Sequence, residues 1–239
     1  MKFFLLITGI IFFNASVIYA QTEADTINQK DENGLKQGYW KKYNESDMLK
    51  YEGTFINDKP DGDFTYYYPE GEVKARAYFY DDGKKSTTTI YHFSGNIMSE
   101  GFYKEKEKDS LWKYYNIDGV LLKEEFYRDT MKHGSWKTYF EDGLIAEETT
   151  WQYNIQEGPW KQYFPDGTLK LEGNYLNNEK QGEFKYYYNT GRLNVVGQYD
   201  NSYKTGEWFY MDENSTVIKK EVYEKGKVIA EEDFSPEEK

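Results

Sequence analysis

The sequence predicts an all-β fold, an elongated antiparallel meander of eight 24-residue β-hairpin repeats that forms a twisted single-layer sheet. The first observation is the aromatic content, with 25 Tyr, 15 Phe and 6 Trp, because such residues favour the pleated, half-buried surface of strands. The second is a small residue that opens an aromatic group every 24 residues without any insertion. A register this strict indicates identical units stacked on one another, since an insertion would break the contact between neighbours.

Residues 1–20 have the pattern of a secretory signal peptide. Lys2 precedes an apolar run from Phe3 to Phe13, and the small residues Ala15 and Ala20 follow it, so we expect cleavage after Ala20. The alternatives are a membrane anchor or a buried helix, but an anchor needs roughly 20 predominantly apolar residues. The pattern therefore predicts an exported protein that is periplasmic, on the cell surface or secreted.

The rest of the chain limits the kinds of partner. Residues 21–34 form a polar linker, and no later apolar stretch is long enough to cross a membrane, so we expect no integral membrane segment after cleavage. The absence of Cys excludes thiolate metal sites and leaves stability to packing. A net charge of −12 argues against a nucleic-acid partner, because phosphate is repelled. The excess of acid is interpreted as a means of keeping an aromatic-rich protein soluble.

The first strand of each repeat is expected to start at the opening small residue. These residues number the repeats from 1 to 8: Gly38, Gly62, Ser86, Ser110, Gly134, Gly158, Gly182 and Gly206. Two positions on, Thr88 stands in repeat 3 and an aromatic residue in the other seven: Trp40, Phe64, Trp112, Trp136, Trp160, Phe184 and Trp208. Five positions on, where the strand is expected to end, stand Tyr43, Tyr67, Tyr91, Tyr115, Tyr139, Tyr163, Tyr187 and Met211.

A turn and a second strand complete each repeat. The turn position, nine residues after the opening one, holds Asp47 and Ser215 in the outer repeats and glycine between them: Gly71, Gly95, Gly119, Gly143, Gly167 and Gly191. Glycine at this place indicates a tight hairpin with a positive φ. The second strand runs from an aliphatic to an aromatic residue, as in Leu169 to Tyr175, and polar segments such as residues 176–182 turn the chain into the next repeat. About sixteen strands follow from two strands per repeat.

These positions resemble the MORN-repeat variant of bacterial YwqK-like proteins, which are often labelled antitoxins. The whole pattern is present in Gly158, Trp160, Tyr163, Gly167, Leu169, Glu172, Gly173 and Tyr175. The resemblance covers about residues 35–228 and implies an elongated, twisted sheet of hairpins with no general catalytic residues. This chain departs from the pattern at Thr88, Ser86 and Ser110, and at Glu125, Thr149 and Glu221, where a second-strand Gly is expected. The resemblance therefore does not imply that the middle of the sheet is as uniform as its ends.

Two charged series predict how the strands of a hairpin pair. Lys recurs three positions after the opening residue and Glu fourteen positions after it, as Lys161 and Glu172 do in repeat 6. If these positions are opposite each other, the aromatic residue at position two lies opposite the Gly at position fifteen, and a ring can cover a bare glycine on the neighbouring strand. We interpret the charged pairs as a means of fixing the register; the alternative is a polar docking face.

The chain offers little for catalysis. His92 and His133 lie in different repeats, outside any metal-ligand spacing, and are interpreted as surface or turn residues. Adjacent acids such as Glu124 and Glu125 point to opposite faces of a strand, so they do not form a glycosidase pair. We expect no enzyme, no catalytic residue, no metal site and no cofactor.

Consecutive tyrosines provide a candidate binding surface: Tyr66, Tyr68, Tyr114, Tyr186 and Tyr188. Stacked aromatic faces suit sugars or protein hot spots. The alternative is that a single-layer sheet uses the aromatic residues of both faces to bury its own backbone.

The leading functional hypothesis is an exported, non-catalytic scaffold that binds a protein partner. The second is carbohydrate binding, since Ser110-Leu-Trp-Lys-Tyr-Tyr115 resembles the aromatic hairpins of choline- and glucan-binding cell-wall repeats. An antitoxin role, suggested by the resemblance, fits export poorly because most toxins of such systems act in the cytoplasm. A hydrolase ranks last.

The two ends of the array are expected to differ. Residues 229–239 are assigned to a closing strand, which starts near Val228 and reaches Phe234, and an acidic tail. Pro236 and the clustered acids are typical means of preventing further strand addition. The N-terminal edge lacks such protection, so the sequence predicts aggregation or dimerisation after truncation at Glu224 and little change after removal of residues 21–34.

Overall fold

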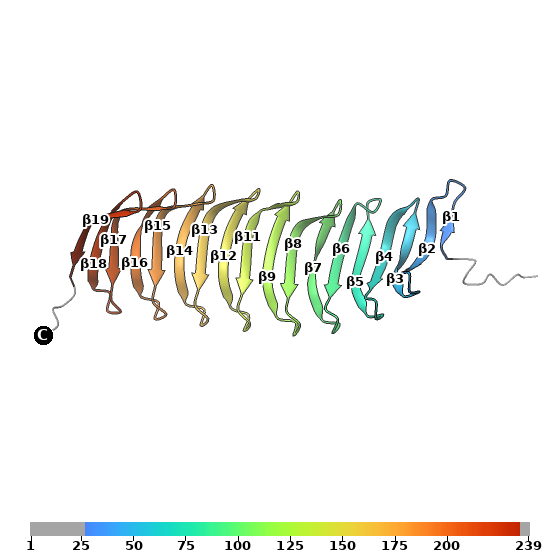
Figure 1. Ribbon diagram of the computed structural model, residues 1–239, viewed down its shortest axis with the longest axis horizontal. Helices are drawn as coiled ribbons and strands as arrows, with labels where there is room; N and C mark the ends of the chain where they lie inside the picture. The colour runs from blue at the N-terminus through green and yellow to red at the C-terminus, as the bar shows by residue number, and fades with distance from the viewer. Residues whose placement is uncertain (1–26, 235–239) are drawn as a thin grey trace, which may run out of the picture.

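A computed structural model describes residues 27–234, which form one open antiparallel sheet of 19 strands. The strands follow one another along the long axis in chain order, and the described residues contain no helix (Figure 1). The all-β meander that the repeat pattern predicts is therefore confirmed. The expected signal peptide (residues 1–20), residues 21–26 of the expected linker and residues 235–239 of the expected acidic tail lie outside the described residues.

Eight hairpins account for sixteen of the strands, one hairpin for each repeat. The short strands β1 and β10 and the closing strand β19 are the other three. The strands are β1 (Gln29–Lys30), β2 (Lys36–Tyr43), β3 (Leu49–Ile56), β4 (Lys59–Tyr67), β5 (Val73–Tyr80), β6 (Lys85–Tyr91), β7 (Ile97–Lys104), β8 (Glu107–Tyr115), β9 (Leu121–Arg128), β10 (Met131–Lys132), β11 (Gly134–Tyr139), β12 (Ile145–Gln152), β13 (Ile155–Tyr163), β14 (Leu169–Leu176), β15 (Glu179–Tyr187), β16 (Leu193–Asp200), β17 (Tyr203–Met211), β18 (Val217–Glu224) and β19 (Lys227–Asp233).

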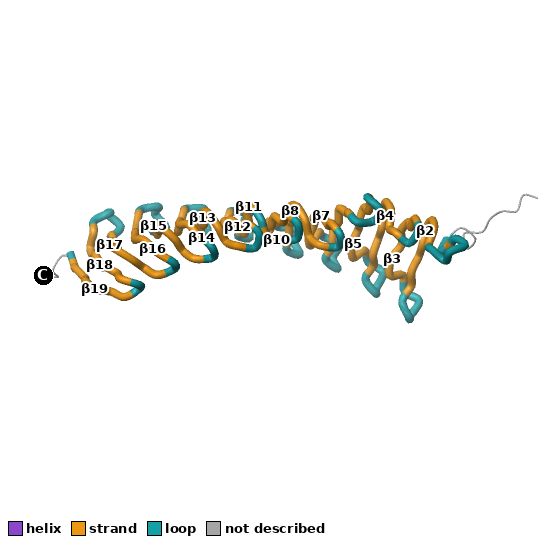
Figure 2. The backbone as a smooth tube through the Cα atoms, turned by 90° about the horizontal axis from the view of Figure 1, so that it is seen from above, coloured by secondary structure: helices purple, strands orange, loops and turns teal. Residues whose placement is uncertain are grey.

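The sheet is twisted along its length. Seen from above, the strands are almost end-on in the middle of the molecule and increasingly broadside toward both ends (Figure 2). L-amino acids impose this twist on every strand, and an open sheet accumulates it from strand to strand. The two ends of the array therefore present their faces in different directions.

The turns within the hairpins have the conformation that the sequence predicts. In repeat 6 the chain turns through Pro165, Asp166 and Gly167, with φ of +84° at the glycine, and Phe164 and Thr168 close the loop through a 2.8 Å backbone hydrogen bond. A positive φ is also found at the equivalent residues of the other repeats: Asp47, Gly71, Gly95, Gly119, Gly143, Gly191 and Ser215. A residue in this left-handed region completes a three-residue hairpin loop.

The turns between repeats are shorter than the sequence predicts, and the strands that follow them start earlier. The turn expected over residues 176–182 consists of Asn177 and Asn178 alone, both with positive φ, and β15 already begins at Glu179. Two positive φ values in a two-residue loop match the right-handed twist of the flanking strands. The prediction that the first strand starts at the opening residue is confirmed for β11, which begins at Gly134, and is wrong for the other repeats, whose first strands begin one to three residues earlier.

The opening residue is instead a bulge inside the strand. Gly158 has φ of +104°, and the register between β12 and β13 shifts in this region. Ser110 adopts the same left-handed conformation with φ of +59°. A small residue recurs here because a bulge with positive φ strains larger side chains. Ser86 is the exception, since β5 and β6 pair without a register shift.

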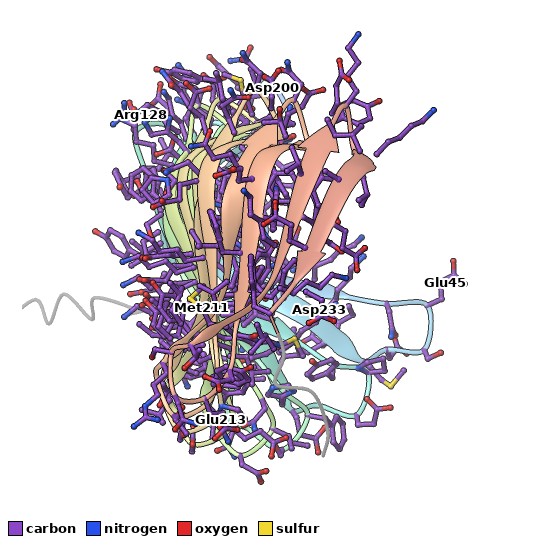
Figure 3. The ribbon with its side chains drawn as sticks, turned by 90° about the vertical axis from the view of Figure 1, so that its left-hand side faces the viewer. Glu45, Arg128, Asp200, Met211, Glu213 and Asp233 are labelled. Carbon is purple, nitrogen blue, oxygen red and sulfur yellow. The ribbon has the colours of Figure 1, made fainter. Side chains whose placement is uncertain are left out.

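Side chains cover both faces of the sheet, and no second layer of backbone lies over either face in the part of the chain that the structure describes (Figure 3). The most buried side chains belong to the aromatic series at position two, with Trp112 and Trp208 at 1% exposure and Phe184 at 0%. The core is thus a row of rings on one face of the sheet.

The two edges differ in length. β19 pairs with β18 from Lys219 opposite Asp233 to Glu224 opposite Lys227, whereas β1 contributes only two residues to β2. The closing strand lies one residue earlier than the expected Val228 to Phe234.

Candidate binding surface

The two faces of the sheet carry different residues. The ring face holds the aromatic series at position two together with the aromatic residues at position seventeen of the second strand, such as Trp208 and Tyr199, whose ring centroids are 5.1 Å apart. The ladder face holds the Tyr at position five and the Glu at position fourteen, such as Tyr163 and Glu148.

On the ring face, an aromatic ring covers the glycine of the preceding repeat. The expected register is confirmed, because Trp160 lies opposite Gly173 and Phe184 opposite Gly197. However, a Cβ added at Gly173 would lie 2.5 Å from the ring of Phe184, in the following repeat. The prediction therefore named the right residue types but the wrong partner, because each ring leans back across the junction between two hairpins.

The same contact recurs where position fifteen is glycine. An added Cβ would lie 2.5 Å from Phe64 at Gly53, 2.3 Å from Trp112 at Gly101 and 2.1 Å from Trp208 at Gly197. These junctions have no room for a side chain beneath the ring. Where Thr149 replaces glycine, Trp160 is only half-buried.

A lysine two positions before the opening residue covers the outer side of many rings. Its ammonium lies 5.0 Å from the ring centroid for Lys36 on Trp40 and 4.1 Å for Lys204 on Trp208. The same arrangement is found for Lys108, Lys132 and Lys180 on Trp112, Trp136 and Phe184. Burial lowers the pKa of both Lys180 and Lys204. These contacts are cation–π interactions, and they close the ring row against solvent.

On the ladder face, hydrogen bonds from Tyr to Glu connect successive repeats. The Tyr163 hydroxyl donates to Glu148 of the preceding repeat at 2.9 Å, and Tyr187 donates to Glu172 at 2.7 Å. Equivalent bonds join Tyr67 to Glu52, Tyr115 to Glu100 and Tyr139 to Glu124. Burial, together with the bond to the carboxylate, raises the pKa of Tyr163 to about 12.

The Lys and Glu series also face each other as expected, but at longer range. Lys137 pairs with Glu148 at 3.4 Å and Lys113 with Glu124 at 3.9 Å. Such partly exposed pairs contribute little, roughly 0–1 kcal/mol each. The sequence contained both the Tyr and the Glu series at fixed positions, but only the lysines were assigned to the glutamates. The Tyr–Glu contact crosses from one repeat to the next, which the pattern within a single hairpin does not reveal.

All five tyrosines of the candidate binding surface are half-buried. Tyr114 donates to Glu125 at 2.8 Å, and the hydroxyl groups of Tyr186 and Tyr199 lie 3.3 Å apart, both on the ring face. Tyr68 and Tyr188 lie at strand ends and donate to the carbonyls of Tyr91 and Met211 in the next repeat. The Tyr66 ring stacks on Phe64 at 6.2 Å. The structure thus uses these side chains within the sheet.

Both histidines contact neighbouring residues of the sheet. His92 lies 3.1 Å from the Tyr115 carbonyl, in the same strand-end position as Tyr68, and His133 lies between the rings of Phe126 and Tyr153. In residues 27–234 no group of three or more His, Cys, Asp or Glu residues is arranged to hold a metal ion. No helix of the described chain is long and apolar enough to span a membrane.

Two carboxylates replace the covered glycine in repeats 4 and 8. Glu125 accepts hydrogen bonds from Tyr114 and Tyr127, both 2.8 Å away, and pairs with Lys123. Glu221 is bound in the same way by Tyr210, Tyr223 and Lys219. Burial alone would raise the pKa of both carboxyl groups, but these donors outweigh burial and lower it, to about 2 for Glu221.

Repeat 3 departs from the others in both strands that meet at its junction with repeat 2. Thr88 stands where a ring is expected, and it lies opposite Ala77, which takes the place of the covered glycine. The opening residue Ser86 does not have a positive φ. A positive φ is found instead at Gly83, in a longer turn between Tyr80 and Lys85. The ring row is therefore interrupted here.

These features define a β-hairpin repeat protein whose open sheet presents two long surfaces. The family model of the MORN repeat variant matches residues 36–57, 60–82, 86–105, 132–153, 156–177 and 180–201, which together make up more than half of the chain. The chain belongs to this family. MORN repeats are a non-enzymatic repeat type that generally mediates protein or membrane interactions.

Other comparisons add little to the family assignment. No curated protein matches this chain. Among solved structures, one similar chain belongs to "Crystal Structure of TcdB2-TccC3-Cdc42", with 13% sequence identity and a TM-score of 0.20. The alignment covers 82% of this chain but only 15% of that chain. At this TM-score the likeness carries no argument about fold or function.

Proposed function

We propose that this protein is an exported, non-catalytic scaffold that binds a protein partner through its sheet. The observation that carries the proposal is an aromatic patch on the ladder face, formed by the exposed side chains of Tyr78, Tyr80 and Leu111 and the half-buried ring of Phe102. Tyr78 is 52% and Leu111 41% exposed. The Tyr80 ring lies 6.3 Å from that of Tyr78 and 6.2 Å from that of Phe102. Clustered exposed apolar side chains are typical of interaction surfaces.

A protein partner fits this sheet better than a carbohydrate. Sugar-binding aromatic residues present an open ring face to the ligand. The rings of the repeats are instead covered, as in Trp112, which is 1% exposed beneath Lys108. Carbohydrate binding remains the second candidate through the half-buried tyrosines such as Tyr114. An antitoxin role, as in YwqK-like proteins, requires a toxin that meets this chain outside the cytoplasm.

Capture by the purified chain, residues 21–239, tests the proposal. We expect wild-type protein on beads to retain a protein from an envelope extract, with retention lost after protease treatment of that extract. Tyr78→Ser with Leu111→Ser should reduce retention at least tenfold, because both changes remove apolar area from the patch. Tyr203→Ser is the matched control, since Tyr203 is 61% exposed but lies in repeat 8. Equal retention by both variants, or retention of glycan alone, would refute the proposal.

Export is tested separately by intact-mass measurement. Protein recovered from outside the cytoplasm should begin at Gln21, because the signal peptide is expected to be removed after Ala20. Recovery with Met1 still attached contradicts cleavage, and recovery from the cytoplasm alone contradicts export.

A further inference from the structure

The interruption of the ring row in repeat 3 leaves a pocket. Its volume is about 290 Å³, and its walls are formed by Tyr66, Phe79, Tyr103, Ala77, Ser86 and Thr88. Lys84 and Lys106 stand at its exposed rim. Ala77 and Ser86, which are 6% and 3% exposed, form its floor.

The place of the missing ring can be located from the rings on either side. Elsewhere a position-seventeen ring packs against two position-two rings, as Tyr199 does against Phe184 at 4.8 Å and Trp208 at 5.1 Å. Phe79 packs against Phe64 at 5.0 Å, and Tyr103 packs against Trp112 at 4.7 Å. In the register of the strands Ser86 lies between Phe79 and Tyr103, and Thr88, which replaces the ring, lies between Ala77 and Gly101. The pocket therefore occupies the space that a Trp or Phe fills in the other repeats.

The lysine that covers a ring in other repeats lies in a different place in repeat 3. Lys84 has the sequence position of Lys108 and Lys204, two residues before the opening residue, but it lies in the longer turn between β5 and β6. As a result Phe79 pairs with Ser86, whereas the equivalent Tyr199 pairs with Lys204. The mouth of the pocket is thus left open between the turn and the sheet.

The chemistry of the walls favours an aromatic ring over a sugar. The walls are mainly three aromatic rings, and the hydroxyl groups of Ser86 and Thr88 are bonded to each other at 3.2 Å. No Asp, Glu, Asn or Gln is found among the described residues that line the pocket. A sugar site needs several fixed polar groups to orient the ligand. A cavity of about 150 Å³ already accepts benzene, so this pocket has room for an indole or phenyl ring.

We propose that the repeat 3 pocket accepts an aromatic side chain, Trp or Phe, from a segment of the partner protein that contacts the ring face, opposite the patch of Tyr78 and Leu111. The incoming ring takes the position of the missing one, between Phe79 and Tyr103 and above Ala77. The identity of the donor rests on the proposed function, but the capacity of the pocket to hold a ring does not. An anchor side chain in a pocket of this kind is typical of the residues that carry most of a binding free energy.

Binding of 5-fluoroindole, followed by fluorine NMR, tests the pocket without a partner. We expect saturable binding to the wild-type chain and at least tenfold weaker binding to the double variant Ala77→Gly with Thr88→Trp. That variant restores the residues of the other junctions, so its own ring should fill the pocket and its melting temperature should not fall. Thr88→Leu, which fills the space in part, gives a second reading if the double variant does not fold.

Leu176→Trp is the matched control, because it adds the same ring at an exposed position of repeat 6, away from both the pocket and the patch of Tyr78 and Leu111. Its affinity for 5-fluoroindole should stay within about twofold of wild type, since the pocket is left open. Unchanged binding by the filled variants, or an absence of saturable binding to wild type, overturns the proposal. If the indole binds but no protein is captured, the proposed function fails and the pocket stands. If a protein is captured and the filled variants do not weaken its capture, the proposed function stands and the partner is not the donor of the ring.

Discussion

Two neighbouring junctions of the sheet have the same spacing but opposite packing. Between repeats 3 and 4, Trp112 lies directly on Gly101 and is 1% exposed. Between repeats 2 and 3, Thr88 faces Ala77 and a pocket replaces the ring. A single pair of positions thus decides whether a junction is closed by the chain itself or left open to a ligand, while the hairpins on both sides are preserved.

Removal of the ring at the closed junction has the largest expected effect. Trp112→Thr should lower the free energy of unfolding by about 3–5 kcal/mol, because a fully buried Trp loses its contacts and leaves a cavity. Thr88→Ala, the equivalent position of the open junction, should cost less than about 1 kcal/mol. Urea unfolding of both variants measures the difference. Similar losses at the two positions would mean that the junctions are packed alike.

A methyl group under the ring tests the same comparison from the other strand. Gly101→Ala should cost about 1–3 kcal/mol, because the new Cβ would lie 2.3 Å from the Trp112 ring and the ring must shift. The reverse change at the open junction, Ala77→Gly, should cost only about 0.5–1 kcal/mol through backbone entropy. Urea unfolding again gives both values, and a harmless Gly101→Ala would exclude the close contact.

A turn substitution separates the role of the turns from that of the rings. Gly167→Val should cost about 1–2 kcal/mol, because φ is +84° and the left-handed region is strained for a β-branched residue. Lys161→Ala on the ladder face of the same hairpin should change stability by less than about 0.5 kcal/mol. Thermal melts showing equal loss would refute the turn assignment.

The smallest expected effect concerns Glu125, a third occupant of the position held by Gly101 and Ala77. Its folded-state pKa lies below the ordinary value of 4.5 because the bonds from Lys123, Tyr114 and Tyr127 outweigh burial. A lowered pKa stabilises the fold above pH 4.5, and this stabilisation is lost as pH falls through and below that value. Glu125→Gln should therefore reduce the fall in melting temperature between pH 7 and pH 3 by about 3 °C.

Glu183→Gln, whose side chain is 55% exposed, is the control for this measurement. It should leave the acid-induced fall in melting temperature close to that of wild type, because an exposed carboxylate gains little from the fold. If Glu125→Gln behaves like Glu183→Gln, the Glu125 hydrogen bonds do not contribute to the pH dependence.

Much of this architecture is predictable from residue spacing. The hairpins, the turn glycines and the register that places Trp160 opposite Gly173 all depend on residues close in sequence. Contacts between repeats were not predicted, because a pattern read along one hairpin does not say which neighbour a side chain leans toward. Tyr163 reaching Glu148 and Phe184 covering Gly173 are both of this kind.

The repeat 3 pocket was only half visible in the sequence. Thr88 was recognised as a departure from the aromatic series, but Ala77, eleven residues earlier, was not connected with it. Comparison of position fifteen in one repeat with position two in the next would have identified the pair. The displaced turn around Gly83 could not have been found in this way, because the 24-residue spacing is unchanged across it.

Because antiparallel pairing continues from strand to strand, the number of repeats sets the length of the molecule. Neighbouring strands lie about 4.8 Å apart, so each hairpin lengthens the sheet by roughly 10 Å, and eight hairpins extend roughly 80 Å. Five more hairpins follow repeat 3 before β19, which separates the pocket from the closing strand by roughly 50 Å. A ligand held in repeat 3 and anything joined to the far edge are thus kept at a distance that the number of repeats determines.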